Sequence, residues 1–244
     1  MEWADDAVVL SSRPQGETSA VASLLTASRG RHAGLVRGGR SGAGRAALEP
    51  GTLVGARWRA RLPEHLGTLT LEPVRAYGVA LLDRPERLAA LVSACALVEA
   101  GLSEREPHPG LYRALLALFE ALEDPAWAEA MVRWELGLLA ELGFGLDLSH
   151  CAVTGAAEDL TAVSPRSGRA VSRVAAEPWG DRLLPLPDFL AGRGGGGPAE
   201  VRRGLELTGH FLDRHLPRGL PPARRRFAER YGRGAPDMVG NPEP

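Results

Sequence analysis

Lysine is absent from this 244-residue sequence, in which all 29 basic residues are arginine. Every cationic contact is therefore made by a planar guanidinium, a group whose geometry suits phosphate. Cysteine is scarce as well: Cys95 and Cys151 lie far apart, which argues against a disulfide framework and predicts a reducing, cytoplasmic environment. No run approaches about eighteen apolar residues, and the N-terminus lacks a basic region before an apolar one, so neither a membrane span nor a signal peptide is predicted.

The motifs of common enzyme classes are missing too. Two glycine-rich stretches, residues 38–44 and 192–197, contain neither the GK(S/T) of a phosphate-binding loop nor a GxGxxG between a strand and a helix. None of the six histidines forms an HExxH motif, and His210 and His215, five residues apart, fall on different faces of a helix. The sequence therefore predicts a protein that is not an enzyme and holds no cofactor and no metal.

Charge is distributed unevenly along the chain, although the net charge is only −1. Residues 1–79 carry +3 and residues 193–233 carry +6, whereas residues 80–148 carry −7. A basic front, an acidic middle and a basic back indicate separate surfaces with separate partners.

Positive charge is concentrated in residues 29–61, which hold eight arginines and one acid, Glu49. Because side chains alternate between the faces of a strand, residues 54–62 would present Arg57, Arg59 and Arg61 on one face, spaced by roughly 6 to 7 Å. The side chains expected to pack on a core are Val54, Ala56, Trp58, Ala60 and Leu62. Such an arginine row either follows the phosphates of a nucleic acid or forms an ordinary solvated face, and the glycine-arginine loop before it favours binding.

The first 79 residues show short strands separated by turn signals. The strands are expected at residues 7–11, 19–25, 32–37, 53–62 and 68–72. Five strands in so short a segment indicate a small closed sheet, and an OB-type barrel is the simplest prediction.

The rest of the chain is mainly helical in pattern. Apolar stripes at helical spacing, with prolines at helix starts and glycines at helix ends, predict the helices 85–101, 111–122, 124–143, 198–216 and 222–231. The expected domains are a barrel at 1–79, helices at 80–148, a hairpin insert at 149–192, further helices at 193–232 and a disordered tail at 233–244. The predicted fold class is α+β and multidomain, with an OB-fold β-barrel followed by an all-α domain that the hairpin interrupts.

A second basic region lies near the end of the chain. Arg224, Arg225 and Arg226 are consecutive, so they spread around the axis of the last helix. One of them can be structural and pair with the acidic middle segment, while the other two remain exposed. Arg202 and Arg203, on the preceding helix, add to this basic region.

Several short motifs follow one another over nearly the whole chain. They are VLSSRPQGETS at 9–19, GR at 30–31, LVRGGRS at 35–41, LEPG at 48–51, RWELGLLAELGFG at 133–145 followed by Cys151, and RRF at 225–227. Together they resemble the RecO family of bacterial DNA repair proteins. The resemblance implies an N-terminal OB-fold, a helical domain and a hairpin insert that binds zinc in many members. It also implies binding of single- and double-stranded DNA, annealing of complementary strands and, with RecR, loading of RecA onto strands coated by single-strand-binding protein.

The hairpin insert is where the sequence departs from the family. Zinc-binding members carry two CxxC pairs, whereas here the pairs read CAVT at 151–154 and SRVA at 172–175. One thiolate of four remains, and a structural zinc needs about four ligands. We therefore expect no zinc and a degenerate, zinc-finger-like hairpin held by its own packing.

The sequence and the resemblance together nominate two sets of arginines. Those expected to bind nucleic acid are Arg31, Arg37, Arg40, Arg45, Arg57, Arg59 and Arg61. The resemblance implies that the acidic, apolar-ended tail of single-strand-binding protein docks on the helical domain. Candidate contacts for that tail are Arg202, Arg203, Arg224, Arg225 and Arg226.

DNA binding of this kind would be electrostatic and strongly dependent on salt, in a cytoplasmic protein associated with the nucleoid. Aromatic stacking would contribute little, because the barrel segment has few aromatic residues and Trp58 is expected to face inward. Two alternatives remain open: an RNA-associated OB-fold module without a role in recombination, and a scaffold whose arginines serve only solubility.

Overall fold

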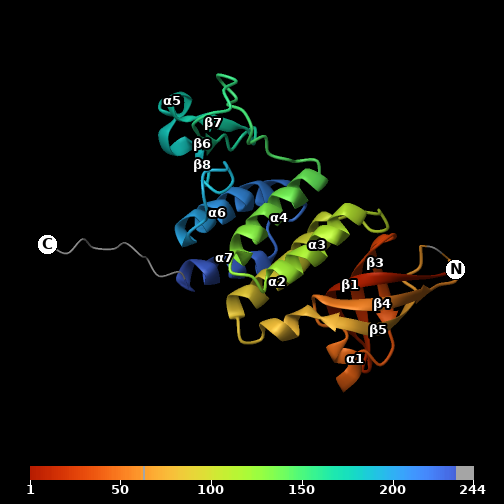
Figure 1. Ribbon diagram of the computed structural model, residues 1–244. Coiled ribbons are helices and arrows are strands. Elements are labelled where there is room, and N and C mark those ends of the chain that lie inside the picture. The colour runs from red at the N-terminus through yellow and green to blue at the C-terminus, as the bar shows by residue number, and fades with distance from the viewer. Residues whose placement is uncertain (63, 235–244) are drawn as a thin grey trace.

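The computed structural model describes residues 1–62 and 64–234. Five strands form a closed barrel in the order β1-β2-β3-β5-β4. They are β1 (Glu2–Gln15), β2 (Ser19–Thr26), β3 (Gly30–Val36), β4 (Thr52–Arg59) and β5 (Thr68–Ala76). Neighbouring strands are antiparallel except β3 and β5, which meet in a short parallel contact at Leu35 and Thr68. This N-terminal sheet fits the OB-fold that the sequence predicts, and it forms one end of the molecule (Figure 1).

The first strand is much longer than the predicted segment 7–11. β1 pairs with β4 through its first half and with β2 through its second half, so backbone hydrogen bonds to two partner strands extend along most of its length. The register against β2 shifts between Val9 and Ser11, a bulge that lets a long strand bend around a small barrel. Strand length here depends on partners far away in the chain, which local patterning cannot reveal.

The fourth strand follows the predicted alternation but ends earlier. Trp58 is 2% exposed and faces the barrel core with Val54 and Ala56. The last residue paired with β5 is Arg59, opposite Thr68, so Arg61 lies beyond the strand. The prediction that Leu62 shares the buried face is wrong, because this side chain is 44% exposed after pairing has ended.

Among the described residues after the barrel, five longer helices form the helical part, and their bounds agree with the predicted ranges within a few residues. They are α2 (Pro85–Gly101), α3 (Pro109–Ala121), α4 (Trp127–Glu141), α6 (Pro198–His215) and α7 (Pro222–Gly234). α4 packs against α3 and α6, and α7 packs beside α2 (Figure 1). Helices from before and after the hairpin insert therefore pack together. None of the helices among the described residues is long and apolar enough to cross a membrane.

The barrel and the helices share apolar contacts. In β1, Val9 points into the barrel interior, whereas Val8 and Leu10 point outward into the core of the helical part. Leu25 of β2 joins Val8 and Leu10 in this outer core, on the side where β1 packs against α2. This two-sided burial explains why β1 reads as a continuous apolar run rather than as an alternating strand. The short 3₁₀ helix η1 (Tyr77–Leu81) connects the barrel to α2.

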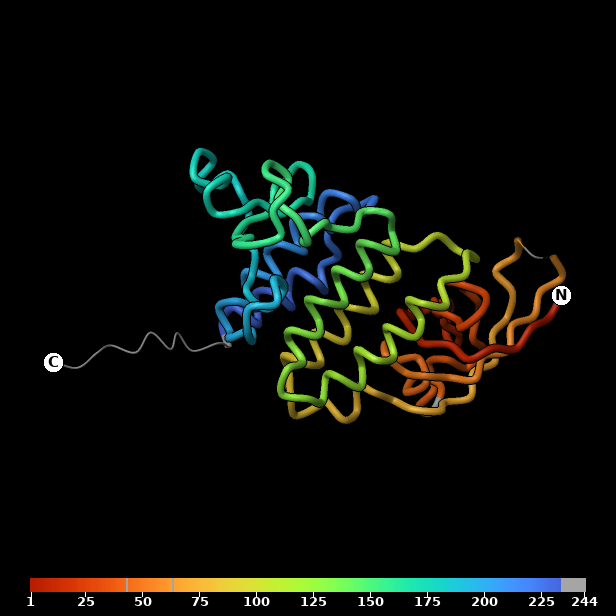
Figure 2. Tube along the Cα trace, turned by 45° about the horizontal axis from the view of Figure 1, so that its top comes forward, coloured from red at the N-terminus to blue at the C-terminus, as the bar shows by residue number. Residues whose placement is uncertain are grey.

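The hairpin insert forms a small lobe at the end of the molecule away from the barrel (Figure 2). Its elements are β6 (Leu160–Val163), β7 (Ala170–Ser172), α5 (Arg173–Ala176), η2 (Gly180–Arg182) and β8 (Leu184–Pro185), with sheet order β7-β6-β8. Of the predicted disordered tail at 233–244, the first two positions belong to α7. The remaining positions lie outside the described residues.

Candidate nucleic-acid interface

The arginine loop, defined as residues 37–45, follows β3 and ends in the short helix α1 (Gly42–Ala46). Two of its glycines are required, one by backbone conformation and one by close packing. Gly38 has a φ of +69°, which favours glycine, and a side chain on Gly44 would come within 2.5 Å of the Gly38 carbonyl oxygen. The loop folds back on itself, so the arginines of the GGRSGAGR segment are held close to the barrel.

Arg40 fixes the loop to the neighbouring β1–β2 turn. Its backbone N–H donates to the Thr18 carbonyl (3.1 Å), and its guanidinium Nη1 donates to the Gly16 carbonyl (2.8 Å). Arg40 is exposed despite these bonds. Because a guanidinium has five N–H donors, one bond to Gly16 leaves donors available for a phosphate.

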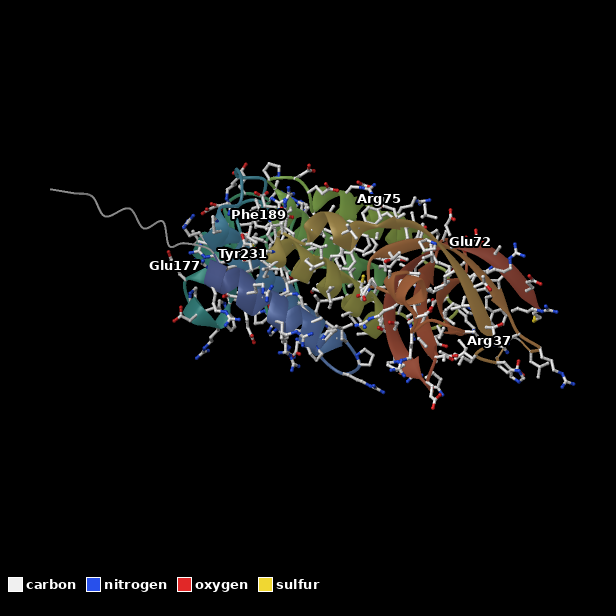
Figure 3. All side chains as sticks on the ribbon, turned by 90° about the horizontal axis from the view of Figure 1, so that it is seen from below. Arg37, Glu72, Arg75, Glu177, Phe189 and Tyr231 are labelled. Carbon is white, nitrogen blue, oxygen red and sulfur yellow. The ribbon has the colours of Figure 1, made fainter. Side chains whose placement is uncertain are left out.

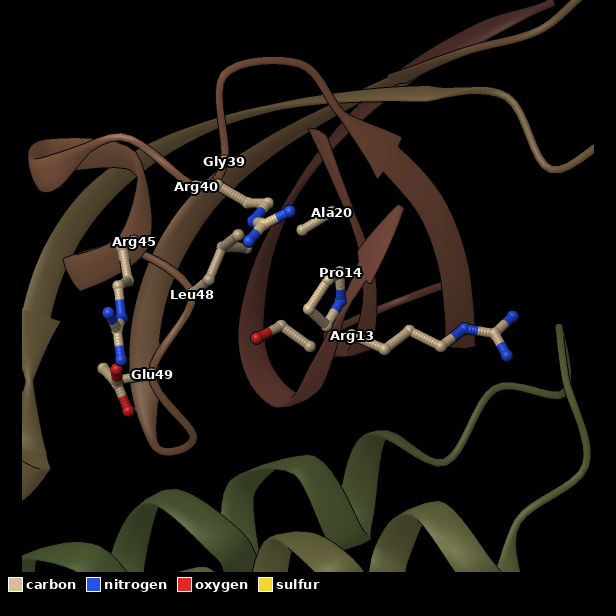
Figure 4. Close-up of a pocket in the computed structure, with 9 residues that line it drawn as sticks. Arg13, Pro14, Ala20, Gly39, Arg40, Arg45, Leu48 and Glu49 are labelled. Atoms are coloured by element: carbon tan, nitrogen blue, oxygen red, sulfur yellow. The ribbon is translucent and has the colours of Figure 1, made fainter. Parts of the chain in front are cut away.

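A pocket of about 380 Å³ opens between the arginine loop and the end of β1 (Figure 4). The charged residues in its lining are Arg13, Arg40, Arg45 and Glu49. Arg45 points toward Glu49, while Arg13 extends in the other direction (Figure 4). Arg13 was not among the predicted site residues, although it lies inside the first family-like motif, because nothing local shows that β1 ends beside the loop. Arg37 is exposed at the start of the same loop.

The arginine row on β4 faces a different environment. Arg57 and Arg59 are exposed on the outer side of the strand, as the alternation predicts. Arg57 lies 3.9 Å from Glu2, and the shallow depression beside it is also lined by Asp5, Asp6 and Glu72. The surface around Arg57 is therefore of mixed charge and more acidic than basic.

Arg31 serves the fold and is unsuited to the binding role expected for it. Its Nε donates to the Leu102 carbonyl (2.9 Å), and its Nη1 lies 3.4 Å from the carboxylate of Glu104. Its side chain is only 18% exposed. These contacts join β3 to the segment between α2 and α3, so the Arg31 guanidinium is occupied within the chain.

Arg224 is likewise structural. Its side chain is 2% exposed and forms an ion pair with Glu135 of α4, which is fully buried. Nη2 of Arg224 also donates to the Leu205 carbonyl (2.8 Å), and Thr208 donates to the same carboxylate (2.5 Å). The arginine that the sequence allowed to pair with the acidic middle segment is therefore Arg224, and it is not available to a partner.

Two of the other basic residues near the C-terminus, Arg202 and Arg225, line a groove between α6 and α7. This groove has a volume of about 350 Å³. It is lined by Arg202, Leu205, Glu206, Gly209, Leu220, Arg224, Arg225, Ala228 and Gly232. Arg203 lies outside this lining and pairs with Glu200 (2.5 Å), and Arg226 is exposed elsewhere on α7.

Figure 3 shows that Phe189 and Tyr231 lie at the end of the molecule opposite to Arg37 and Glu72 of the barrel.

Comparison with known proteins decides the family. A model of the N-terminal part of Recombination protein O matches residues 1–77, and a model of its C-terminal part matches residues 82–224. The chain belongs to the RecO family. It is 62% identical over 237 residues to the DNA repair protein RecO of Rhodospirillum centenum, covering 95% of each chain. It is 52% identical over 250 residues to that of Rhodospirillum rubrum, covering 96% of this chain and 97% of the relative. A role in DNA repair and recombination follows.

The hairpin insert, for which the family resemblance implies a zinc site in many members, has a different donor set in this chain. Sγ of Cys151 is buried and accepts hydrogen bonds from the Ser172 N–H (3.3 Å), the Ser172 hydroxyl (3.4 Å) and the Thr154 N–H (3.5 Å). Burial opposes ionisation, but these bonds outweigh it and lower the pKa of Cys151 to about 6. Among the described residues, no three metal-ligating side chains gather in one place. One thiolate, surrounded by hydroxyl and amide donors, does not fit tetrahedral zinc.

Proposed function

We propose that this RecO-family chain binds single- and double-stranded DNA through the arginine loop, anneals complementary strands and, with RecR, assists the loading of RecA onto strands coated by single-strand-binding protein. The observation that carries this proposal is the group of exposed guanidiniums from Arg13, Arg37, Arg40 and Arg45, which two segments far apart in sequence bring to one end of the barrel. No chemistry is required of the protein, and we propose that it acts in the cytoplasm, at the nucleoid, without enzymatic activity.

The mechanism is electrostatic. Each phosphate that a guanidinium neutralises releases condensed counterions, so the logarithm of the binding constant should fall with the logarithm of salt concentration by about 0.7 to 0.9 per contact. Two strands held on one basic surface repel each other less and meet at a raised local concentration. Annealing then needs no step beyond binding and pairing. Arg13, Arg37, Arg40 and Arg45 are the residues proposed to make the phosphate contacts.

The test is an annealing assay with complementary strands, bare and coated by the cognate single-strand-binding protein. We expect an Arg13→Ala/Arg37→Ala/Arg45→Ala variant to anneal at least tenfold more slowly. For the same variant, the slope of the logarithm of the DNA-binding constant against the logarithm of salt concentration should become shallower by about two to three. Arg40 is left in place, because its bond to Gly16 supports the fold.

The matched control is an Arg57→Ala/Arg59→Ala/Arg61→Ala variant, which removes the same charge from the predicted arginine row. Because that face also carries Glu2, Asp6 and Glu72, this control variant should lose clearly less annealing rate and salt dependence than the arginine-loop variant. Equal losses in both triple variants would shift the proposal to the whole barrel surface. A wild-type protein that anneals neither bare nor coated strands contradicts the proposal, and tighter binding to RNA than to DNA of equal sequence favours the RNA-associated alternative.

We further propose that the groove between α6 and α7 receives the acidic, apolar-ended tail of single-strand-binding protein. Arg202 and Arg225 would meet the acidic residues, while Leu205, Leu220 and Ala228 provide apolar contact. Arg225 is exposed and lies 3.8 Å from Asp213, a weak surface pair that a tail carboxylate can replace. A tail peptide labelled with a fluorophore should bind wild type and lose at least tenfold affinity with Arg225→Glu, whereas Arg226→Glu, on the same helix, should leave it unchanged.

A further inference from the structure

The barrel carries a second pocket, at the end of the β2–β3 ladder remote from the arginine loop. It has a volume of about 330 Å³. Four segments line it: Met1 with Glu2 and Trp3 at the start of β1, Ser28, Arg29 and His32 of the β2–β3 hairpin, Trp58 of β4, and Arg105 and Pro107 of the α2–α3 connection. His32 pairs with Leu24, and Val36 beside Arg37 pairs with Ala20, so the two sites are separated by about four residues of strand, roughly 13 Å.

Three rings form the floor of this pocket. Trp3 stacks on Trp58 with ring centroids 5.9 Å apart and planes 14° apart. His32 meets both rings edge-on at 5.0 Å. Trp58 is held in the core and donates its indole N–H to the Leu66 carbonyl (2.9 Å), whereas Trp3 is partly exposed. Trp3 therefore presents a flat aromatic surface backed by a fixed ring.

His32 points to a ligand in this pocket. The residue is 6% exposed, and neither of its ring nitrogens has a hydrogen-bond partner among the described residues. Buried polar groups without partners are rare and costly, so two in one side chain call for an explanation. Burial and the charges of Arg105 and Arg29 lower the pKa of His32, which keeps the imidazole neutral with one donor and one acceptor.

Positive charge frames the pocket. Arg29 and Arg105 are exposed, and Arg105 has a φ of +66°, a strained conformation for a residue other than glycine. Its backbone is held there by donation to the Arg31 carbonyl (2.8 Å). Glu2 adds one carboxylate, which repels phosphate but accepts hydrogen bonds from exocyclic amino groups of bases.

We propose that this pocket binds one unstacked base of a single strand. The base stacks on Trp3, its edge meets the neutral His32 after a small rotation of the buried imidazole toward the pocket, and its backbone phosphates lie along Arg29 and Arg105. The inference rests on the proposed DNA-binding function and adds a subsite specific for single strands, since a paired base in a duplex cannot enter. It also revises the sequence-based interpretation that stacking contributes little, because Trp58, although buried, supports an accessible partner in Trp3.

The test compares a fifteen-residue thymidine strand with an abasic strand of equal length, which keeps the phosphates and lacks the bases. Wild type should bind the thymidine strand about tenfold more tightly than the abasic strand, which is roughly the affinity that one stacked base contributes. Binding of the thymidine strand should also quench tryptophan fluorescence. Trp3→Ala should reduce this preference to near one and leave duplex affinity within twofold. Trp3→Phe keeps a ring and should retain most of the preference, and Trp179→Ala, at an exposed tryptophan of the remote lobe, should change nothing.

Each other result has a distinct meaning. A wild-type preference that survives in a folded Trp3→Ala protein, or the absence of any preference, overturns the base pocket while leaving the arginine loop in place. An acidic, apolar-ended peptide that displaces no DNA but quenches fluorescence in a Trp3-dependent manner assigns the pocket to a peptide and also overturns the proposal. A wild type that binds no DNA at all contradicts the proposed function itself.

Discussion

At the scale of single residues, Glu135 and Arg224 form an ion pair in the interior of the helical part. Glu135 is fully buried, and Arg224 is 1% exposed. The carboxylate accepts from Arg224 and from Thr208, and the guanidinium also donates to the Leu205 carbonyl, so the polar atoms of the pair have partners on α4, α6 and α7. A buried pair with this many hydrogen bonds fixes how three helices meet.

Removing one member of this pair should be severely destabilising. Arg224→Ala leaves an uncompensated carboxylate in the core, and we expect a loss of about 3 to 5 kcal/mol in the free energy of unfolding. Urea titration followed by circular dichroism measures it. The matched control is Arg226→Ala, an exposed arginine two positions later, which should stay within about 0.5 kcal/mol of wild type. Similar values for both variants would show that the pair contributes little to stability.

At the scale of elements, the small lobe shows how a hairpin is held together without a set of metal ligands among the described residues. The two segments at the positions of the CxxC pairs, CAVT at 151–154 and SRVA at 172–175, lie close together around the sulfur of Cys151. Backbone and hydroxyl donors now surround that sulfur. Leu160, Val163 and Ala170 are buried beneath and belong to the core of the helical part, so apolar packing holds the lobe.

We therefore expect the lobe to be independent of zinc. After washing with a chelator, metal analysis should find far less than one zinc per chain, and the thermal unfolding midpoint should be the same with and without added chelator. A relative with both CxxC pairs, treated in the same way, is the positive control. Stoichiometric zinc that resists the chelator in this chain, and is lost in Cys151→Ser, would contradict the expectation.

At the scale of the whole molecule, the barrel and the helical part are joined by apolar packing and by close backbone contact. Val8, Leu10 and Leu25 of the barrel are buried in the core of the helical part. The β2–β3 turn fits against the α2–α3 connection so tightly that a side chain on Gly30 would lie 2.0 Å from the Glu106 carbonyl oxygen. This contact also places Arg105 beside His32, which completes the base pocket.

Because of this contact, Gly30→Ala should destabilise the molecule more than Gly16→Ala, which introduces similar backbone strain without a clash. Gly30 and Gly16 both have positive φ, +71° and +66°, but nothing lies within 4 Å of a side chain added at Gly16. Gly16→Ala should cost about 1 kcal/mol and Gly30→Ala clearly more, as measured by urea unfolding. Gly30→Ala should also weaken binding of the thymidine strand. If both variants cost the same, the contact with Glu106 does not constrain the structure.

The sequence by itself determined the types and order of the long elements and indicated the family. Helix stripes, the prolines that open α2, α6 and α7 and the alternation around Trp58 are local patterns, so they could be read without the fold. The excess of arginine in residues 29–61 was evident in the same way, as was the missing zinc ligand set.

Only the tertiary structure decided what each arginine does, because a guanidinium has no local signature for its partner. Arg31 and Arg224 belong to the fold through contacts with Glu104 and Glu135, each more than seventy residues away. Arg13 joins the arginine loop because β1 ends beside it, and Arg57 loses its basic surroundings because β1 brings Glu2 next to it. These outcomes depend on strand pairing and helix packing over long distances in the chain, which short-range patterns do not encode.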